Sequence, residues 1–311
     1  MENFLLKYDV HSIRGELLLP SGAQVDESLI AEFVRNRNDK VSKEYYFAEL
    51  GSPLADLTRF LAKPPYNAIF SDPAETEEIL AIMGQVRLLE PVIDSLDYFR
   101  EKDFHTYRHS LMVFALSTLL ARHLYPNDRT ALLGSLAGPS HDLGKSCVHV
   151  EILQKKTPLT RPELAMLKHH VFAGYIQLSF YTGDPRHLTA QVARDHHERR
   201  DCSGYPRGTG NFTELVEIAI LSDIYDALIS PRPYRPVSYD NRSALEELTK
   251  MAEKGQVGWL ALKALVAFNR RNRPDYQECE VSLERRGMPP ANNVYGLIAE
   301  ENDGDSGGTG S

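Results

Sequence analysis

Histidine is concentrated in one part of this 311-residue chain, because ten of its eleven histidines lie between His105 and His197. Within that stretch His141 is followed directly by Asp142, in the string HDLGK. An imidazole beside a carboxylate can bind a cation, and the two carboxylate oxygens can bridge a pair of cations. Since an isolated His-Asp pair is more often a surface pair or a helix end, this interpretation depends on further ligands.

Further candidate ligands follow at regular intervals. His170 comes twenty-nine residues after His141, and the pair His196-His197 begins twenty-six residues later. Asp223 lies twenty-six residues beyond that pair. The His-Asp pair is therefore joined by three more histidines and one more carboxylate.

Two more candidates lie upstream. Glu101 and His105 are four residues apart, so on a helix they would share one face and could approach the same ion. The candidate set becomes five histidines and three carboxylates: Glu101, His105, His141, Asp142, His170, His196, His197 and Asp223.

The ligand types indicate which chemistry this set could perform. Mixed nitrogen and oxygen ligands suit Fe or Mn in open octahedral sites better than a closed, thiolate-rich zinc site. Cys147, Cys202 and Cys279 are odd in number and far apart, which predicts neither a disulfide framework nor a zinc knuckle. Two neighbouring metals can make a hydroxide from water at neutral pH and stabilise in-line attack on a phosphate, without a Ser or Cys nucleophile.

Charge and hydropathy narrow the classes of partner. The formal net charge of −8 argues against non-specific binding to a nucleic acid polymer or to an anionic membrane surface. The sequence contains no apolar run near the 18 to 20 residues of a spanning helix, and the start MENFLLKYDVHS does not resemble a secretory signal. We therefore expect a protein of the reducing cytoplasm.

The organisation of the chain predicts three parts. Residues 1–72 read as a small α+β accessory or dimerisation domain, with a hairpin over 7–25 and helical patches at 26–38 and 52–62. Residues 73–285 read as an all-α domain, and the polar, Gly/Ser-rich end of 286–311 favours disorder. Helical periodicity marks these segments: 74–99, 108–124, 128–138, 161–180, 187–197, 214–229, 241–252 and 255–271.

The pattern resembles the HD-GYP family of bacterial phosphodiesterases over roughly residues 100–236. The resembling strings are HxxR at 105–108, HDLGK, ILxK at 152–155, LTxxE, HHE at 196–198, GYP at 204–206, and DIYDAL followed by RPYR. The resemblance implies a helical domain with a buried centre of two or three divalent metals, Fe or Mn. It also implies hydrolysis of the bacterial second messenger cyclic di-GMP to linear pGpG, GMP or both, through a metal-bound hydroxide.

Matched motif by motif, the resemblance implies a role for each candidate. The metal ligands would be His105, His141, Asp142, His170, His196, His197 and Asp223, with Asp142 as the bridge. Glu101 falls where some members supply a carboxylate to a third metal, which favours complete hydrolysis to GMP. Asp142 and Lys145 would be catalytic, and Lys145, Arg232 and Arg235 would contact the phosphates. An ordinary solvated lysine and loop-bracing arginines are the alternatives.

Other residues have weaker assignments. The turn Gly204-Tyr205-Pro206 reads as a structural element or as a surface for a partner such as a diguanylate cyclase domain, and the five remaining histidines of the region, His109 among them, match no ligand position. Asp226 could be a partner of a ligand histidine. Cys202 stands where the family usually has glycine, which could reshape a tight turn.

Three alternatives to cyclic di-GMP hydrolysis remain. The chain could hydrolyse another cyclic dinucleotide, because no motif here reads the bases. It could be a weakly catalytic sensor of cyclic dinucleotides or an interaction module. It could also be a general nucleotidase of the wider HD group, although GYP and RPYR would then have no purpose.

Overall fold

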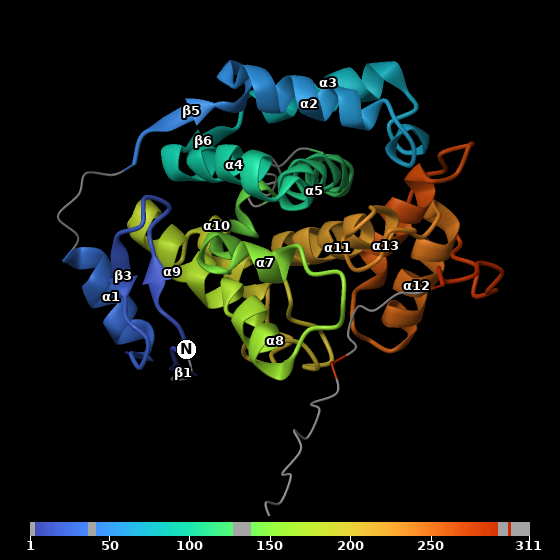
Figure 1. The fold of residues 1–311 in the computed structure, drawn as a ribbon. Helices are drawn as coiled ribbons and strands as arrows, with labels where there is room; N and C mark the ends of the chain where they lie inside the picture. Colours follow the sequence, from blue (N-terminus) through green and yellow to red (C-terminus); the bar gives the residue numbers. More distant parts are fainter. Residues whose placement is uncertain (1–3, 37–41, 127–137, 292–297, 300–311) are drawn as a thin grey trace, which may run out of the picture.

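The computed structural model describes residues 4–36, 42–126, 138–291 and 298–299, and these are mostly helical with a few short strands (Figure 1). The predicted class, an all-α bundle with a small α+β region at the N-terminus, is confirmed. Among the described residues, no helix combines the length and the apolar character that crossing a membrane requires.

The N-terminal region contains the predicted hairpin. Strands β2 (Val10–His11) and β3 (Leu17–Leu19) pair antiparallel, and β1 (Phe4–Leu5) pairs antiparallel with β4 (Gln24–Val25). Helix α1 (Glu27–Arg35) follows, and its N-cap is Asp26, whose side chain accepts a hydrogen bond from the Leu29 amide at 2.7 Å. The strands and α1 pack against α9 (His170–Thr182), with the rings of Phe4 and Phe172 stacked at 3.8 Å.

A helical layer covers the middle of the molecule. It contains α2 (Gly51–Leu61), the 3₁₀ turn η2 (Tyr66–Ala68) and α3 (Pro73–Gly84), which lie above α4 (Glu90–Lys102) and α5 (Phe104–Leu124) in Figure 1. A two-stranded ribbon connects this layer to α4, because β5 (Glu44–Tyr46) pairs antiparallel with β6 (Arg87–Leu89). The 3₁₀ turn η1 (Phe47–Glu49) joins β5 to α2.

Among the described residues, the second half of the chain adds these helices: α7 (Val150–Leu153), α8 (Arg161–Lys168), α9, α10 (Leu188–Asp195), α11 (Glu214–Ile229), α12 (Asn241–Glu253) and α13 (Trp259–Phe268). Two 3₁₀ turns, η3 (Gly138–Ser140) and η4 (Leu143–Cys147), precede α7. Helix α5 is buried along most of its length and contacts α2, α3, α4, α11 and α13. It therefore forms the centre of the larger core.

At two places a single predicted helix is two separate helices. The predicted helix over 74–99 is two helices, because β6 interrupts it to pair with β5. The predicted helix over 161–180 is also two, since α8 ends at Lys168 and α9 begins at His170. The helix predicted over 128–138 lies almost wholly outside the described residues.

The predicted domain boundary near residue 72 stays a prediction. Phe47, Leu57 and Ile69 on one side of it belong to the same buried cluster as Leu111 and Leu221 on the other. The N-terminal helices thus complete the core that surrounds α5. In the predicted tail, the amides of Arg286 and Gly287 donate to the Glu246 carboxylate at 2.8–3.1 Å, while most of 288–311 lies outside the described residues or has no regular structure.

Candidate metal centre

Five parts of the fold bring histidines and carboxylates to one buried place. Helix α5 supplies His109 and α11 supplies Asp223, while the turn between η3 and η4 supplies His141 and Asp142. The start of α9 supplies His170, and the end of α10 supplies the pair His196-His197.

Two glycines allow these parts to approach one another. A Cβ on Gly138 would lie 2.4 Å from the Phe114 Cα, so only glycine lets η3 touch α5. A Cβ on Gly144 would lie 2.0 Å from the His170 carbonyl oxygen, so only glycine lets η4 touch α9. The glycine of HDLGK therefore fixes Asp142 close to the first turn of α9.

The first group of ligand atoms consists of His109, His141 and Asp142, with Asp223 beside them. The Nε2 atom of His109 lies 3.2 Å from Nε2 of His141, 2.9 Å from Oδ1 of Asp223 and 3.6 Å from Oδ2 of Asp142. His109, His141 and Asp142 are almost completely buried.

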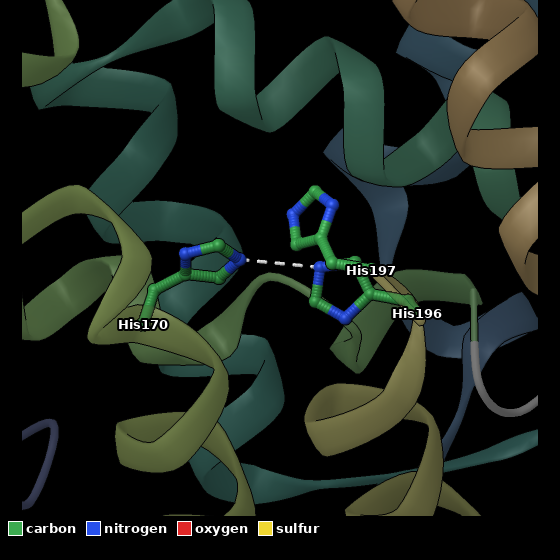
Figure 2. A group of neighbouring side chains, drawn as sticks. All are labelled: His170, His196 and His197. Carbon is green, nitrogen blue, oxygen red and sulfur yellow. Dashed lines mark hydrogen bonds between the residues drawn. The ribbon is translucent and has the colours of Figure 1, made fainter. Parts of the chain in front are cut away.

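The second group consists of His170, His196 and His197 (Figure 2). The Nε2 atoms of His170 and His196 face each other at 3.2 Å, and the ring of His197 lies next to both. In each group the candidate ligand atoms lie within 4.8 Å of one another.

Asp142 lies between the two groups. Its Oδ2 atom is 3.3 Å from Nε2 of His141, and its Oδ1 atom is 3.5 Å from Nε2 of His170 and 3.8 Å from Nε2 of His196. One carboxylate oxygen therefore faces each group, the arrangement that a bridging ligand requires.

The hydrogen bonds of the rings show that the groups suit cations. The Nδ1 atoms of His141 and His170 lie 2.6 Å from the carbonyl oxygens of Gly138 and Leu167, and Nδ1 of His196 lies 3.0 Å from two carbonyls of α10. Since carbonyls only accept, each Nδ1 carries the proton and each Nε2 presents a lone pair. Lone pairs that face each other at 3.2 Å repel, and a cation between them would remove that repulsion.

The pKa values agree with this protonation. Burial lowers the pKa of His170 to about 3 and, together with His141, lowers that of His196 to about 4. Burial also favours a protonated Asp142, but the nearby Lys145 and His141 outweigh it and hold the Asp142 pKa well below its usual range. At neutral pH His170 and His196 are therefore neutral and Asp142 is ionised, the forms that bind metal ions. The pKa of His141 is instead raised, because the neighbouring Asp142 and Asp223 outweigh the effect of its burial.

His109 is held by a partner outside the two groups. Its Nδ1 atom lies 2.6 Å from Oδ2 of Asp226, a fully buried residue one turn after Asp223 on α11. Asp226 also receives the hydroxyls of Tyr66 and Ser230, and the guanidinium of Arg232 lies 3.5 Å from it. The expectation that Asp226 could be a partner of a ligand histidine agrees with this geometry.

The structure does not bring Glu101 and His105 into either group. Helix α4 ends at Lys102 and α5 begins at Phe104, so the two residues do not share one helical face as we expected. Glu101 is exposed, and the half-buried ring of His105 interacts with the backbone of Pro231 instead.

His109, which matched no ligand position in the sequence, is instead the histidine of α5 that reaches the site. It lies one turn deeper than His105, where α5 crosses α11. Asp103 was the available signal, because a helix beginning at this common N-cap type would confine His105 to the first turn.

The predicted substrate contacts have different surroundings. The ammonium of Lys145 lies 2.6 Å from Oδ2 of Asp142 and is partly exposed. Arg232 is buried beside Asp226, with Nε lacking a hydrogen-bond partner in the described structure. Arg235 is also buried, and its guanidinium donates to the carbonyls of Ala227, Leu228 and Ser230 at the end of α11. This is the loop-bracing arrangement that was the alternative for Arg235.

The Gly204-Tyr205-Pro206 turn packs against the second group. The ring of Tyr205 stacks on His197 with centroids 4.7 Å apart, and the ammonium of Lys168 lies 4.6 Å from the Tyr205 centroid. The buried carboxylate of Glu198 accepts from the amides of Arg207 and Thr209 at 2.7 and 3.0 Å, which fixes the loop.

The comparisons with known proteins agree with this geometry. A family model described as HD domain matches residues 96–258, just over half of the chain. A protein of Pseudomonas aeruginosa named cyclic di-GMP phosphodiesterase is 37% identical over 164 residues, which cover 51% of this chain and 38% of that protein. A Vibrio cholerae protein named 3'3'-cGAMP-specific phosphodiesterase 1 is 29% identical over 225 residues, or 71% of this chain and 49% of that protein.

The chain thus spans less than half the length of these curated relatives. Among solved structures, an HDG"Y"P protein from Bdellovibrio bacteriovorus aligns over 86% of this chain and 94% of its own, with 15% identity and a TM-score of 0.46. The predicted resemblance is confirmed at the level of the HD domain and of relatives named as cyclic dinucleotide phosphodiesterases. By the match over 96–258, the chain belongs to the HD domain family.

Proposed function

We propose that this protein is a metal-dependent phosphodiesterase that hydrolyses cyclic di-GMP to linear pGpG, GMP or both. The observation that carries the proposal is Asp142, whose two oxygens face two separate groups of histidine nitrogens. Such an arrangement suits two divalent ions a few ångströms apart, and the nitrogen and oxygen donors suit Fe or Mn. The names of several relatives support the substrate class.

The proposed ligands are His109, His141, Asp142 and Asp223 for one ion and His170, His196, His197 and Asp142 for the other. Ions bound here would supply Lewis-acid chemistry, activating water and neutralising phosphoryl oxygens. Lys145 holds one oxygen of Asp142 and adds a positive charge at the partly exposed side of the site. Arg232 adds a buried guanidinium whose pKa Tyr234, Asp226 and Asp223 raise against the effect of burial.

Two metals, rather than three, fit the described residues. The case for a third ion depended on Glu101, which is exposed near the end of α4 and joins neither group. Glu101 was also the reason to expect complete hydrolysis to GMP, so that expectation loses its support. Product analysis decides between pGpG and GMP.

The specificity for cyclic di-GMP is the finer part of the proposal. Relatives named as 3'3'-cGAMP-specific phosphodiesterases match this chain as well, so that mixed-base ring is the second candidate substrate. Both rings present the same phosphodiester to the two groups, and a direct comparison of the two substrates separates the candidates.

The test is chromatographic product analysis with protein that is purified anaerobically and loaded with Fe(II) or Mn(II). Metal-dependent release of pGpG or GMP supports the proposal, and the Asp142→Ala variant should lose it. His149→Ala is the matched control, because this histidine is exposed and lies seven residues from Asp142 in the chain. Absence of turnover of either ring by a fully metal-loaded sample would favour a sensor of cyclic dinucleotides.

A protein partner is a separate proposal. A diguanylate cyclase domain could dock on the Gly204-Tyr205-Pro206 loop, where Asp201, Cys202 and Ser203 are exposed beside the half-buried Tyr205. Homodimerisation through residues 1–72 and a cytoplasmic location likewise stay predictions.

A further inference from the structure

A chain of buried hydrogen bonds joins the first group of candidate ligands to a residue from the N-terminal part of the protein. Nδ1 of His109 lies 2.6 Å from Oδ2 of Asp226, and the other oxygen of Asp226 accepts from the hydroxyl of Tyr66. The Tyr66 oxygen also lies 2.6 Å from the hydroxyl of Ser230. Tyr66 is 3% exposed, so no bulk water substitutes for these partners.

This chain determines which nitrogen of His109 is available for a metal. Because the Asp226 carboxylate accepts, Nδ1 of His109 carries a proton, and Nε2 is the nitrogen that points towards Asp142, His141 and Asp223, where a bound cation would take the place of a proton. The hydroxyl of Tyr66 occupies the far oxygen of the same carboxylate. Without that hydroxyl, this buried oxygen keeps the Ser230 hydroxyl, at 3.1 Å, but loses its second donor, and the carboxylate is free to turn towards Arg232.

The position of Tyr66 is itself fixed by distant parts of the chain. The side-chain amide of Asn241, at the start of α12, donates to the Pro65 carbonyl at 3.1 Å, and the guanidinium of Arg273, after α13, donates to the Ile69 carbonyl. Tyr66 thus stands on a short turn that is tethered on both sides. The tertiary structure therefore places its hydroxyl beside Asp226, and no motif of the sequence indicates this contact.

We propose that Tyr66 is a positioning residue of the metal centre. Its hydroxyl holds Asp226 in the orientation that aims Nε2 of His109 at the metal bound by the first group. The affinity of that group for a divalent ion therefore depends on Tyr66, while the affinity of the group formed by His170, His196 and His197 does not. This inference rests on the proposed two-metal centre and adds to it a residue that contacts neither metal nor substrate.

The experiment is a titration of the metal-free full chain with Mn²⁺, in which free Mn²⁺ is followed by electron paramagnetic resonance. Tyr66→Phe keeps the buried ring and removes the hydroxyl. We expect it to weaken one of the two Mn²⁺ sites by 10- to 100-fold, roughly the effect of removing a partner of a metal ligand, and to leave the other unchanged. Tyr107→Phe is the matched control, since Tyr107 is on the same helix as His109 and its hydroxyl donates to Asp56 at 2.8 Å.

A second comparison separates positioning from general loosening of the core. In an Asp226→Asn background, Tyr66→Phe should cause no further loss of Mn²⁺ affinity, because the hydroxyl acts through the carboxylate. Equal affinities in wild type and Tyr66→Phe would overturn the inference, and so would an equal loss at both sites. Failure of the wild type to bind two Mn²⁺ ions would instead count against the proposed function.

Discussion

His105 and His109 stand one turn apart on α5, but only His109 reaches the carboxylates of Asp223 and Asp142, at 2.9 and 3.6 Å. His105 lies in the first turn of the helix, half-buried and next to Pro231. The difference decides which histidine would complete the first group of ligands. It gives a direct test of the proposed centre.

Substitution of His109 should lower the metal content, and substitution of His105 should not. His109→Ala removes a nitrogen from the first group, so we expect the loss of about one bound ion and a fall in phosphodiesterase activity of at least 100-fold. His105→Ala should keep both ions. Metal analysis by mass spectrometry after gel filtration measures the content, and loss of an ion from His105→Ala would restore the assignment made from the HxxR string.

The comparison shows what the sequence can and cannot predict. The motifs that contain His141, His170, His196 and Asp223 are far apart in the sequence, and the structure brings these four residues together because each motif lies in its own segment of the site. The sequence could not show whether His105 or His109 reaches the site, because both lie in one segment. A shift of one helical turn changes how deeply a side chain lies in the core. That depth depends on where α5 begins and on how it crosses α11, which are tertiary properties.

Tertiary structure also determines the partners of the two arginines in RPYR. A guanidinium is equally suited to a phosphodiester and to backbone carbonyls, so the residue type predicts both roles. Only the return of the loop onto the end of α11 places Arg235 over three carbonyl oxygens. Arg232, from the same motif, reaches Asp226 instead.

Replacement of Arg235 should therefore lower stability. Arg235→Met removes the donor that three backbone carbonyls share, and we expect a loss of about 2 kcal/mol in the free energy of unfolding, measured by urea denaturation. Arg242→Met is the control, because this arginine is exposed and the carboxylate that it pairs with, Glu246, keeps the backbone amides of Arg286 and Gly287 as donors. We expect a change below about 0.5 kcal/mol there. A raised KM at unchanged stability for Arg235→Met would favour direct contact with substrate.

The metal-free protein should lose stability as the pH falls below 6.5. Burial lowers the pKa of His170 to about 3 and that of His196 to about 4, whereas the unfolded chain takes up these protons near pH 6.5. The unfolded state then binds more protons than the folded state, so stability decreases from pH 6.5 towards pH 4. The raised pKa of His141 acts in the opposite sense, but above this window.

The size of this effect follows from linkage. Each of the two histidines should cost roughly 2 kcal/mol between pH 7 and pH 5. Urea denaturation in the presence of a chelator at both pH values measures this loss of stability. His170→Gln should reduce the number of protons taken up on unfolding below pH 6.5 by about one. Equal free energies of unfolding at pH 7 and pH 5 would contradict the low pKa values.

Cys202 provides a test of backbone strain beside the site. Its φ of 64° lies in the left-handed region, where a Cβ costs roughly 1–2 kcal/mol, and this is the position at which the resemblance leads us to expect glycine. Cys202→Gly removes the clash but gives the unfolded chain more freedom, so we expect a net gain of about 0.5–1 kcal/mol in the free energy of unfolding.

Cys202→Ala separates strain from the chemistry of the thiol, because it removes the sulfur and keeps the Cβ. We expect no gain for alanine. Since Cys202 is exposed and its amide donates to the Arg199 carbonyl at 2.9 Å, neither change should disturb that hydrogen bond or the stack of Tyr205 on His197. If glycine and alanine stabilise the protein equally, the left-handed backbone is not the cause and the exposed thiol is.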